Sequence, residues 1–494
     1  MEYLIPAWHS QLKDWSITIP QIEIYDGVNF LHVLKNSGRK VGLVLTDYQP
    51  QAFAKISNSS VNLDSYISIF DYLQGVENFS ARTLDYRDFN WPKNVTFDYT
   101  SFVILVYLKN DLIARVILDT NGRVLFVEYY NHGQITKKLT IDSRGFISSE
   151  ESDKDIRFFD PVGYWRFLVD KQTNQVKINP QFSYFNKQSY DSLQELLNEV
   201  MQEKFLKKIK KTDHLIVTLD DDSTISYQNY ADFSPIYVLN KRHPYQRSIQ
   251  QVITGQIIVP AQADIKTVTN LLTNNLPVSM MPSYPTQVTL GHSQRLNRQI
   301  IAVFAEYMNY RELKQVAEML YQRLIARPKD EGLQFLTYSI EQETLVQQVI
   351  AELKQAHDGS FLIEGNIKVK SENQIEMEDD LPIIYLKNTR LTSLNDLVKT
   401  FDKLRVLINW NQSDDLIETA AIGAGIPRLQ NFESFSLVNY KNGEIFHSIE
   451  ELNHGLDDYL HNLDKWNQAL VYNVELLNRY SEENLIQKWD KLLK

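Results

Sequence analysis

The spacing of apolar side chains over the first eighty residues is typical of alternating strands and helices. Residues 3–7 form a short apolar run, and residues 30–38 place apolar side chains at helical spacing before Gly38. Residues 41–45, which read Val-Gly-Leu-Val-Leu, are typical of a buried strand. Because a strand, a helix and a second strand in this order build parallel sheets, the N-terminal segment predicts a βαβ unit.

From about residue 83 to residue 180 the apolar positions alternate with a period of two. The breaks at Lys109-Asn110 and at 120–123, which reads Thr-Asn-Gly-Arg, separate successive strands, and Asn-Gly is a strong hairpin signal. Further strands are predicted at 135–141, 157–160 and 165–169. The pattern therefore predicts an antiparallel sheet that is inserted into the first α/β domain.

The α/β pattern then resumes. Asp191 is predicted to cap a helix with Gln194 as its capping-box partner. The lysines at the end of this helix either pair with its C-terminal dipole or form a patch for a phosphate or a partner: Lys207, Lys208, Lys210 and Lys211. Later strands are predicted at 214–219, 235–239, 256–259, 287–290, 333–338, 361–364, 382–386 and 405–409. Later helices are predicted at 300–326, 343–355, 394–404 (capped by Ser393) and within 449–493.

These changes of period predict an α/β chain in five segments. They are residues 1–82 and 181–250 as two parts of a first Rossmann-like domain, 83–180 as the inserted antiparallel β domain, 251–465 as a second Rossmann-like domain, and 466–494 as C-terminal helices that pack back on the first domain. A length of 494 residues with 43% hydrophobic and 23% charged side chains fits such a globular protein.

Charge and cysteine content exclude several classes of function. The net charge of −11 argues against a general nucleic-acid binder, and the absence of cysteine excludes thiolate catalysis and cysteine-based zinc sites. The N-terminus does not read as a signal peptide, and the longest apolar run, near 102–108, is too short to cross a bilayer. We expect a cytoplasmic protein, with attachment to a membrane machine through partners left open.

Motifs that carry chemistry are scarce. Walker A, G-x-G-x-x-G, G-x-S-x-G and H-E-x-x-H patterns are missing from the sequence. Asp220-Asp221-Asp222 follows a predicted strand and either holds a divalent metal or forms a solvated acidic turn; the turn is favoured, and no metal or cofactor is expected. His9, beside Trp8 at the exit of the first strand, is either a general base or a residue that fixes the loop.

Four segments resemble GT-B glycosyltransferases. Residues 287–297 (QVTLGHSQRLN) are similar to the G-R-L-x-x-x-K element of the retaining enzymes, and 418–427 (ETAAIGAGIP) to their E-A-x-x-x-G-x-P helix start. Residues 438–443 (VNYKNG) resemble the strand and turn that follow, and the segment from Asp26-Gly27 to Leu45 resembles the family's opening motif. The resemblance implies two Rossmann-like domains with a cleft between them.

The same resemblance shows donor-site residues that this chain lacks. The columns that hold an Arg and a Lys on the nucleotide diphosphate contain His292 and Asn297 here, and the two glutamate columns contain Gln412 and Ala420. Glu418 lies two residues from the second glutamate column, about 200° away on a helix. Since cations on the leaving diphosphate usually supply the largest catalytic contribution, sugar transfer is not expected.

One family matches the sequence more closely. The start MEYLIPAWHSQLKDW, the tract at Tyr48-Gln49-Pro50, the inserted sheet and the segment LGHSQRLNRQI resemble the first of the accessory Sec system proteins, over essentially the whole chain. That resemblance implies a Gram-positive export factor for glycosylated serine-rich-repeat adhesins. It also implies a membrane-associated complex with two sibling accessory proteins, alongside the accessory Sec motor ATPase.

Three hypotheses on function follow: a non-catalytic transport factor whose pseudo-glycosyltransferase cleft binds glycan or cargo, an active transferase that modifies the adhesin, or a scaffold whose cleft binds nothing. The exposed edges of the inserted sheet are predicted docking sites for the siblings or the cargo. Carbohydrate-binding candidates are the aromatic cluster Trp8, His9 and Trp15 and a predicted helix start at Gly291, His292, Ser293 and Gln294.

Overall fold

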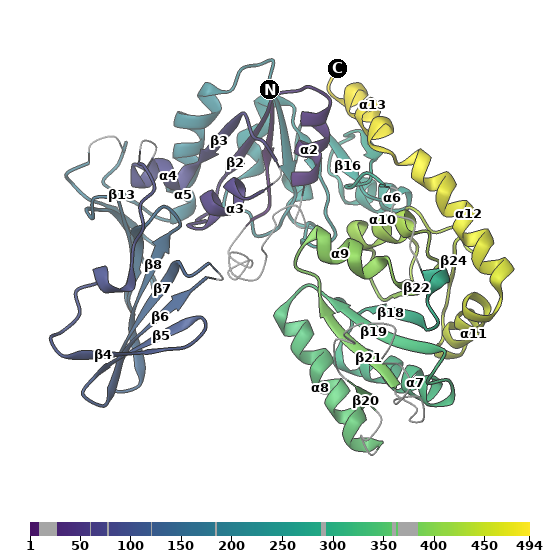
Figure 1. The fold of residues 1–494 in the computed structure, drawn as a ribbon. Coiled ribbons are helices and arrows are strands. Elements are labelled where there is room, and N and C mark those ends of the chain that lie inside the picture. Colours follow the sequence, from purple (N-terminus) through teal and green to yellow (C-terminus); the bar gives the residue numbers. More distant parts are fainter. Residues whose placement is uncertain are drawn as a thin grey trace. The chain divides into compact units, whose positions relative to one another are not determined.

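The computed structural model describes residues 1–8, 27–59, 61–76, 79–119, 121–182, 185–287, 293–357, 362–363 and 384–494. These residues belong to two compact units (Figure 1). Of the described residues, the first unit holds those up to Val238 together with His243–Gln256, and the second holds Leu239–Arg242 and those from Ile257 to Lys494. The five-segment division of the chain stays a prediction.

A parallel sheet organises the first unit. Its strands run in the order β15-β14-β1-β2-β3, with bounds β1 (Glu2–Ile5), β2 (Val41–Leu45), β3 (Ser65–Ser68), β14 (His214–Thr218) and β15 (Ile236–Val238). The accompanying helices are α2 (Val28–Asn36), α3 (Ala52–Ser57), α4 (Ile69–Gln74) and α5 (Leu193–Val200). β1, α2 and β2 form the predicted βαβ unit, in which Leu4 lies opposite Leu43 in parallel register.

A ten-stranded antiparallel sheet follows β3 in the chain (Figure 1). Its spatial order follows the sequence order from β4 to β13, so that strands consecutive in the chain pair with each other. The strands are β4 (Val95–Tyr99), β5 (Val103–Leu108), β6 (Asp111–Leu118), β7 (Val124–Asn131), β8 (Gln134–Asp142), β9 (Phe146–Glu151), β10 (Asp155–Phe159), β11 (Trp165–Asp170), β12 (Val176–Ile178) and β13 (Ser189–Tyr190). Both predicted hairpins are confirmed, and Gly122 has the positive φ that an Asn-Gly turn requires.

Charged and aromatic contacts join the antiparallel sheet to the helices of the first unit. The buried Arg144 donates to both carboxylate oxygens of Asp71 on α4, at 2.8 and 2.6 Å, and pairs with Asp142 on β8. Phe158 on β10 packs edge-on against Tyr48, with ring centroids 5.0 Å apart. The sheet is therefore anchored to the α/β part by buried interactions.

Local capping corrects one predicted helix start and confirms another. The cap of α5 is Ser192, whose hydroxyl accepts from the Glu195 amide, so the prediction of Asp191 is wrong by one residue. Two adjacent oxygen-bearing side chains compete for this role, and the local backbone decides between them. The predicted cap Ser393 does accept from the Asp396 amide at the start of α9 (Leu394–Phe401).

The second unit is built on another parallel sheet, in the order β20-β21-β19-β18-β22-β23-β24. Its strands are β18 (Gln299–Phe304), β19 (Glu331–Thr337), β20 (Leu362–Ile363), β21 (Ile384–Arg390), β22 (Leu404–Asn409), β23 (Arg428–Gln430) and β24 (Gly443–Ile445). The unit also contains a parallel pair, β16 (Gln256–Val259) with β17 (Val278–Met280), and α6 (Gln262–Leu271).

Helices cover both faces of this second sheet (Figure 1). Ile301 and Val303 of β18 face a core that includes α7 (Tyr310–Ala326), α8 (Ile340–Ala356) and α11 (Ile449–His461). Ala302 and Phe304 face the opposite core, formed with α9 and α10 (Asp415–Ala424). The chain continues into α12 (Leu463–Arg479), which contacts α10 and α11, and α13 (Glu482–Leu492). None of the helices in the described residues is both long and apolar enough to cross a bilayer.

The prediction of one helix over 300–326 is wrong in its first part. Residues 299–304, Gln-Ile-Ile-Ala-Val-Phe, form the central strand β18, because their apolar side chains, several of them β-branched, fill both faces of the sheet. The helix α7 begins only at Tyr310, after Asn309 caps it in a capping box with Glu312. Of the strand predicted at 287–290, residues 288–290 lie outside the described residues.

Candidate functional site

The carboxyl edge of the second sheet is the place where an open α/β sheet normally binds its ligand. β18, β19, β22 and β23 end there at Phe304, Thr337, Asn409 and Gln430. α10 begins close by, at Asp415, six residues after β22 ends. A free helix N-terminus at this edge would present N–H groups to an anionic ligand such as a diphosphate.

In this chain a carboxylate of the protein itself occupies the start of α10. Asp414 caps the helix by accepting from the Ile417 amide at 3.1 Å, and its side chain is fully buried. Its two oxygens also accept from Arg242, at 2.9 Å from Nε and 3.1 Å from a terminal nitrogen. The hydroxyls of Tyr338 and Tyr307 donate to the same carboxylate at 3.2 Å each.

We define the Asp414 cluster as Asp414, Arg242, Tyr307 and Tyr338. Within it, the negative charge of Asp414 is balanced by the positive charge of Arg242. Burial opposes the charge of Arg242, but the Asp414 carboxylate holds the pKa of the guanidinium well above its ordinary value. Burial, and then the Asp414 charge, raise the pKa values of Tyr307 and Tyr338 far above their ordinary value. Anion, cation and hydroxyl donors all come from the chain, so the cluster offers no uncompensated charge to a ligand.

The space beside the cluster is nearly filled. The cavity lined by Lys241, Ser283 and Asp415, together with cluster residues, has a volume of ≈ 10 Å³. A volume of that size holds about one water molecule. Asp415 accepts from the Ser283 hydroxyl at 2.7 Å, and burial raises its pKa to about 7. A nucleotide diphosphate does not fit into this cavity.

Buried polar groups without partners remain at the same edge. Asn409, which is 1% exposed, has neither a donor for its amide oxygen nor an acceptor for its amide nitrogen among the described residues. The amide oxygen of Gln430 and the hydroxyls of Thr337 and Thr419 are likewise without a hydrogen bond there. A buried polar group left unpaired costs about 1–3 kcal/mol. This edge therefore keeps the polarity of a binding site without its open volume.

The described positions that are predicted to match donor-contact columns are either engaged elsewhere in the protein or exposed. Gln412 donates its amide to the Lys241 carbonyl at 2.7 Å, and Ala420 packs against the apolar core beside α10. Asn297 is exposed in the turn before β18, and His292 lies outside the described residues. Glu418 is fully buried, 2.8 Å from Arg428, and accepts from Ser436 at 2.6 Å. Its carboxylate therefore binds side chains inside the second unit and is not exposed to a ligand.

Carbohydrate binding by the predicted residues stays a prediction, and the structure describes the surroundings of only some of them. Trp8 is only 3% exposed, and its carbonyl accepts from Gln49 at 2.8 Å, whereas His9 and Trp15 lie outside the described residues. The helix expected from Gly291 is wrong in the part that is described: Ser293–Arg295 form a single 3₁₀ turn, and strand β18 follows. A turn this short offers no helix N-terminus to a sugar.

The expectation of a solvated turn at Asp220-Asp221-Asp222 is also wrong for its first two residues. Asp220 is 1% exposed and lies 3.0 Å from His243, and Asp221 accepts from the amides of Arg247 and Ser248. These contacts come from a segment that follows β15, which the local sequence could not reveal. In the described part of the chain, no group of three or more His, Asp or Glu residues is placed to hold a metal ion.

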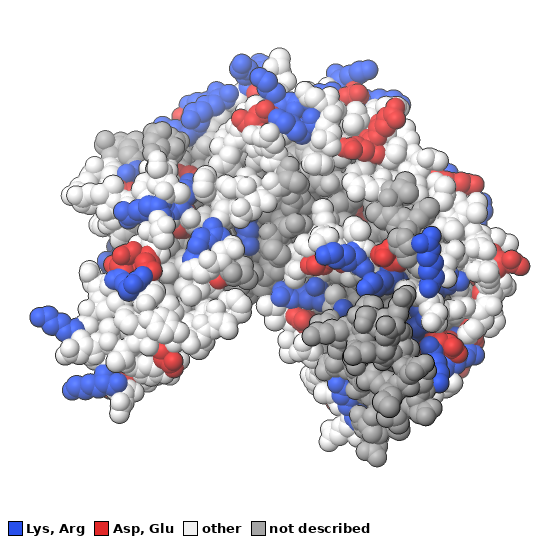
Figure 2. Space-filling view, viewed as in Figure 1, with Lys and Arg blue, Asp and Glu red and all other residues white. Residues whose placement is uncertain are grey.

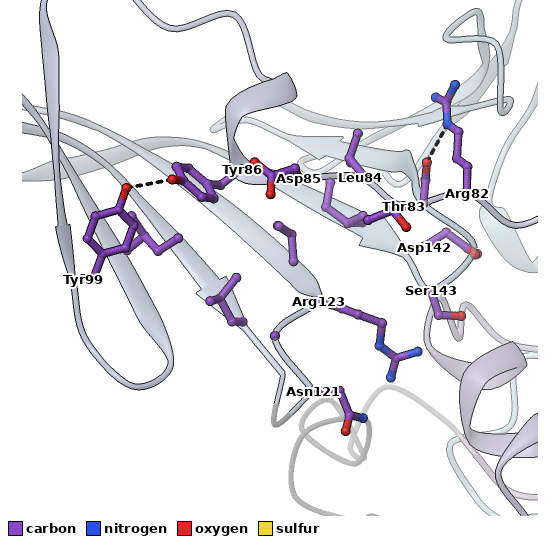
Figure 3. A pocket seen from close by; sticks show the side chains of 16 residues that line it. Arg82, Thr83, Leu84, Asp85, Tyr86, Tyr99, Asn121, Arg123, Asp142 and Ser143 are labelled. Carbon is purple, nitrogen blue, oxygen red and sulfur yellow. Dashed lines mark hydrogen bonds between the residues drawn. The ribbon is translucent and has the colours of Figure 1, made fainter.

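A second concave site lies on the ten-stranded sheet (Figure 3). It has a volume of ≈ 390 Å³, within the range of small-molecule sites. Its wall at Arg82 is fixed, because the Arg82 amide donates to the Arg144 carbonyl and the Arg82 Nε donates to the Gly145 carbonyl, both at 2.9 Å. The floor is apolar and is formed by Leu84, Ile104, Leu118, Val124 and Ile141.

The rim of this sheet pocket is polar. Tyr86 and Tyr99 share a hydroxyl hydrogen bond of 2.7 Å at one end (Figure 3), and Tyr99 is 59% exposed. Three of the lining charges have an oppositely charged neighbour, Arg123 with Asp119, Asp85 with Arg87, and Asp142 with Arg144, whereas the Arg82 guanidinium donates to the Gly145 carbonyl. An apolar floor beneath a rim with hydroxyl groups suits a polyhydroxylated ligand.

Sequence reasoning missed the Asp414 cluster. A Ser-Asp-Asp run before an apolar stretch is a recognisable capping signal, so Asp414 could have been found as a cap. Arg242 stands 172 residues away and carries no local signal.

Comparisons with known proteins find the same family over nearly the whole chain. A family model for the first accessory Sec system protein matches residues 4–494. The accessory Sec system protein of the same description from Streptococcus gordonii is 23% identical over 528 aligned residues, which cover 100% of this chain and 99% of that protein. Among solved structures, accessory secretory proteins 1, 2 and 3 of Streptococcus pneumoniae match with a TM-score of 0.74 and 22% identity, covering 100% of this chain and 99% of that one.

A glycosyltransferase has a similar fold. The pneumococcal O-GlcNAc transferase GtfA, solved with UDP and GlcNAc, matches with a TM-score of 0.70 at 11% identity, covering 100% of this chain and 98% of that chain. The expected GT-B-like α/β fold with an antiparallel sheet is thereby confirmed.

Proposed function

The chain belongs to the family of the first accessory Sec system protein, and on that premise we propose that it is a non-catalytic component of the accessory Sec export complex. Its role in the accessory Sec system follows from the family. The finer proposal is that it carries out no sugar transfer and is required for secretion of a glycosylated serine-rich-repeat adhesin.

The Asp414 cluster is the observation that carries the non-catalytic proposal. A glycosyltransferase of this fold stabilises the leaving diphosphate with fixed cations and a helix N-terminus. Here Arg242 is held by Asp414, the start of α10 is capped by the same carboxylate, and the adjoining cavity is ≈ 10 Å³. Binding a diphosphate would require breaking a buried ion pair before any contact formed.

Titration calorimetry with UDP and UDP-GlcNAc tests this proposal. We expect no binding up to about 1 mM, which corresponds to less than about 4 kcal/mol of binding free energy. The pneumococcal transferase GtfA, whose structure contains UDP and GlcNAc, is the matched positive control. Micromolar binding together with sugar turnover would instead establish the alternative, an active transferase that modifies the adhesin.

The proposed partners are the two sibling accessory proteins, the accessory Sec motor ATPase and the glycosylated adhesin. The match to a structure of accessory secretory proteins 1, 2 and 3 supports the sibling partners. We propose that the chain is cytoplasmic and reaches the translocase through these partners. Co-purification with both siblings, followed by crosslink mapping, tests the assembly, and recovery of the chain alone contradicts it.

For the adhesin we propose that the bound part is glycan rather than polypeptide. The sheet pocket supports this, because it is preformed, has an apolar floor and is lined by two tyrosine hydroxyls. Trp8 is too buried for its ring to stack on a sugar, so the pocket replaces the aromatic cluster as the favoured site. Ser293 and Gln294 stay weaker candidates, since the helix N-terminus expected there is missing.

A glycan-binding assay with matched variants tests the pocket. Two variants remove exposed groups from the pocket rim: Tyr99→Ala and Asn121→Ala. The control is Tyr164→Ala, because Tyr164 is 60% exposed but lies at the β10–β11 turn. We expect both rim variants to weaken binding of GlcNAc oligosaccharides at least about tenfold, because losing one ring contact or one hydrogen bond costs about 1.4 kcal/mol. Equal binding by all variants excludes the pocket, and no binding by the wild type favours a scaffold that binds no glycan.

A further inference from the structure

The outer face of α12 carries apolar side chains that the rest of the described chain leaves exposed. Leu463 is 58% exposed, Val471 62% and Val474 40%. On a helix, residues eight and eleven positions after Leu463 lie on the same side as it, so these three side chains form one apolar stripe. The opposite side of the helix is buried, and Ala469 and Leu476 are fully covered there.

A groove runs along this face of the helix. It is lined by α12 from Asp464 to Glu475 and by Tyr440 and Lys441 in the turn before β24, and its volume is ≈ 650 Å³. We call it the α12 groove. Because an α-helix rises 1.5 Å per residue, the lining part of α12 is about 16 Å long. Figure 2 shows mostly uncharged atoms along the border where α12 lies in Figure 1.

The turn that forms the second wall of the groove is held in place from below. Asn442, which is fully buried, donates to the Ser436 carbonyl at 2.9 Å and to Asn473 of α12 at 3.0 Å. On this turn Tyr440 is 68% exposed. An exposed aromatic ring on a fixed backbone is the type of side chain that anchors protein interfaces, since little conformational entropy is lost when it is covered.

Both ends of the groove are negatively charged. Asp464 and Glu475 are exposed, and neither side chain has a hydrogen bond or an ion pair among the described residues. Among the lining residues the positive charge is that of Lys441, whose amino group lies 5.2 Å from the centre of the Tyr472 ring. The groove is therefore complementary to a ligand that carries positive charges on both sides of an apolar face.

The shape of the groove favours a helix over a small molecule or a sugar. Its described lining residues come from one helix and one turn, whereas a small-molecule site encloses most of the surface of its ligand. Sugars stack on aromatic faces, but the stripe beside this groove is aliphatic. A helix that binds in a groove uses apolar residues over two to three turns, which is about 11–16 Å and matches the lining part of α12.

We propose that the α12 groove docks an amphipathic helix of a protein partner whose polar face is rich in lysine or arginine. The apolar stripe and Tyr440 cover the apolar face of the partner helix, and Asp464 and Glu475 pair with its cations at the two ends. The groove shares no residue with the sheet pocket or with the Asp414 cluster. Docking there is therefore independent of glycan binding and of the absence of catalysis.

A display library of random peptides, selected on the full chain, tests the proposal. The peptides are about 20 residues long, so that they can form several helical turns. Enriched peptides are then measured by fluorescence polarisation against Tyr440→Asn, which removes the anchor. Asparagine tolerates the positive φ of 65° at this position, so the turn is expected to keep its structure. The control is Tyr164→Asn, which removes a ring that is 60% exposed at the β10–β11 turn.

A second variant tests the charges. Asp464→Asn combined with Glu475→Gln removes both carboxylates of the groove. Its control combines Glu341→Gln with Glu450→Gln, which removes two exposed carboxylates from the first turns of α8 and α11. Melting curves that match the wild type show that the variants fold.

We expect the enriched peptides to have an excess of lysine and arginine and apolar residues at helical spacing. Tyr440→Asn should weaken their binding at least about tenfold, and the charge variant about three- to tenfold, whereas both controls bind like the wild type. The proposal is overturned if no enriched peptide is sensitive to Tyr440→Asn, or if the enriched sequences are acidic or lack helical spacing. It is also overturned if Tyr440→Asn instead abolishes binding of GlcNAc oligosaccharides, or a dimer of this chain in sedimentation equilibrium, because the groove then belongs to a sugar or to a second copy.

Discussion

Replacing Asp414 by alanine should strongly destabilise the second unit. The change removes the helix cap of α10, worth about 1 kcal/mol. It also removes the carboxylate that accepts from Arg242, Tyr307 and Tyr338, and a hydrogen bond to a charged group is worth about 1.5–3 kcal/mol. Because the Arg242 side chain is 14% exposed and can be partly hydrated, we expect a total loss of about 3–4 kcal/mol.

Urea-dependent hydrogen exchange, read by mass spectrometry on peptides from α10, isolates the second unit from the first. If the free energy of unfolding falls by about 3 kcal/mol per molar urea, the urea midpoint of these peptides should fall by about 1 M in Asp414→Ala. Asp414→Asn is the matched control, because asparagine caps a helix as well as aspartate does. It should lose only the contribution of the charge, about 1–2 kcal/mol.

A double-mutant cycle separates the ion pair from the cap. Arg242→Met with Asp414→Asn should be less destabilising than the sum of the single changes, by about 1–3 kcal/mol. A loss below about 1 kcal/mol for Asp414→Ala would refute the reasoning, because the carboxylate would then not be what holds the start of α10. Additive single changes would show that Arg242 and Asp414 do not interact energetically.

Three further changes test other parts of the second unit. Burial raises the pKa of Asp415 from 3.8 to about 7, so between these values the native state holds a proton that the unfolded chain has released. The free energy of unfolding therefore falls as pH rises from about 4 to 7. Asp415→Asn should remove that fall and raise the free energy of unfolding by ~2–4 kcal/mol at about pH 8. Urea unfolding at about pH 4 and at about pH 8 measures both effects. Glu418→Ala leaves Arg428 buried and unpaired and should cost about 3–5 kcal/mol, whereas Glu433→Ala, at an exposed position, should change the unfolding midpoint little. Ala420→Glu combined with Asn297→Lys should give no transfer of labelled GlcNAc from UDP-GlcNAc, since Asp414 still occupies the helix start; detectable product would show that the site is still poised for catalysis.

Local patterns in the sequence determined much of the architecture. The apolar run 41–45 became β2 with unchanged bounds, and the Asn-Gly turn became the β6–β7 hairpin. Both signals are local, since a short apolar run and a turn sequence are each recognised within a few residues. The strand β18 was mistaken for part of a helix because a fully buried strand has the same continuous apolar pattern as a buried helix segment, and helix α7 begins six residues after it ends.

The tertiary structure alone decided which polar groups are free to act. Asp220 was predicted to lie in a solvated turn, but it is buried 3.0 Å from His243. Asp414, which was not predicted, has only a local capping signal in the sequence, and its ion-pair partner Arg242 is 172 residues away. Charge, burial and hydrogen-bond satisfaction depend on every neighbour in space, and these neighbours come from distant segments. The sequence could therefore predict the GT-B-like fold, but only the folded chain shows that the protein's own ion pair occupies the start of α10.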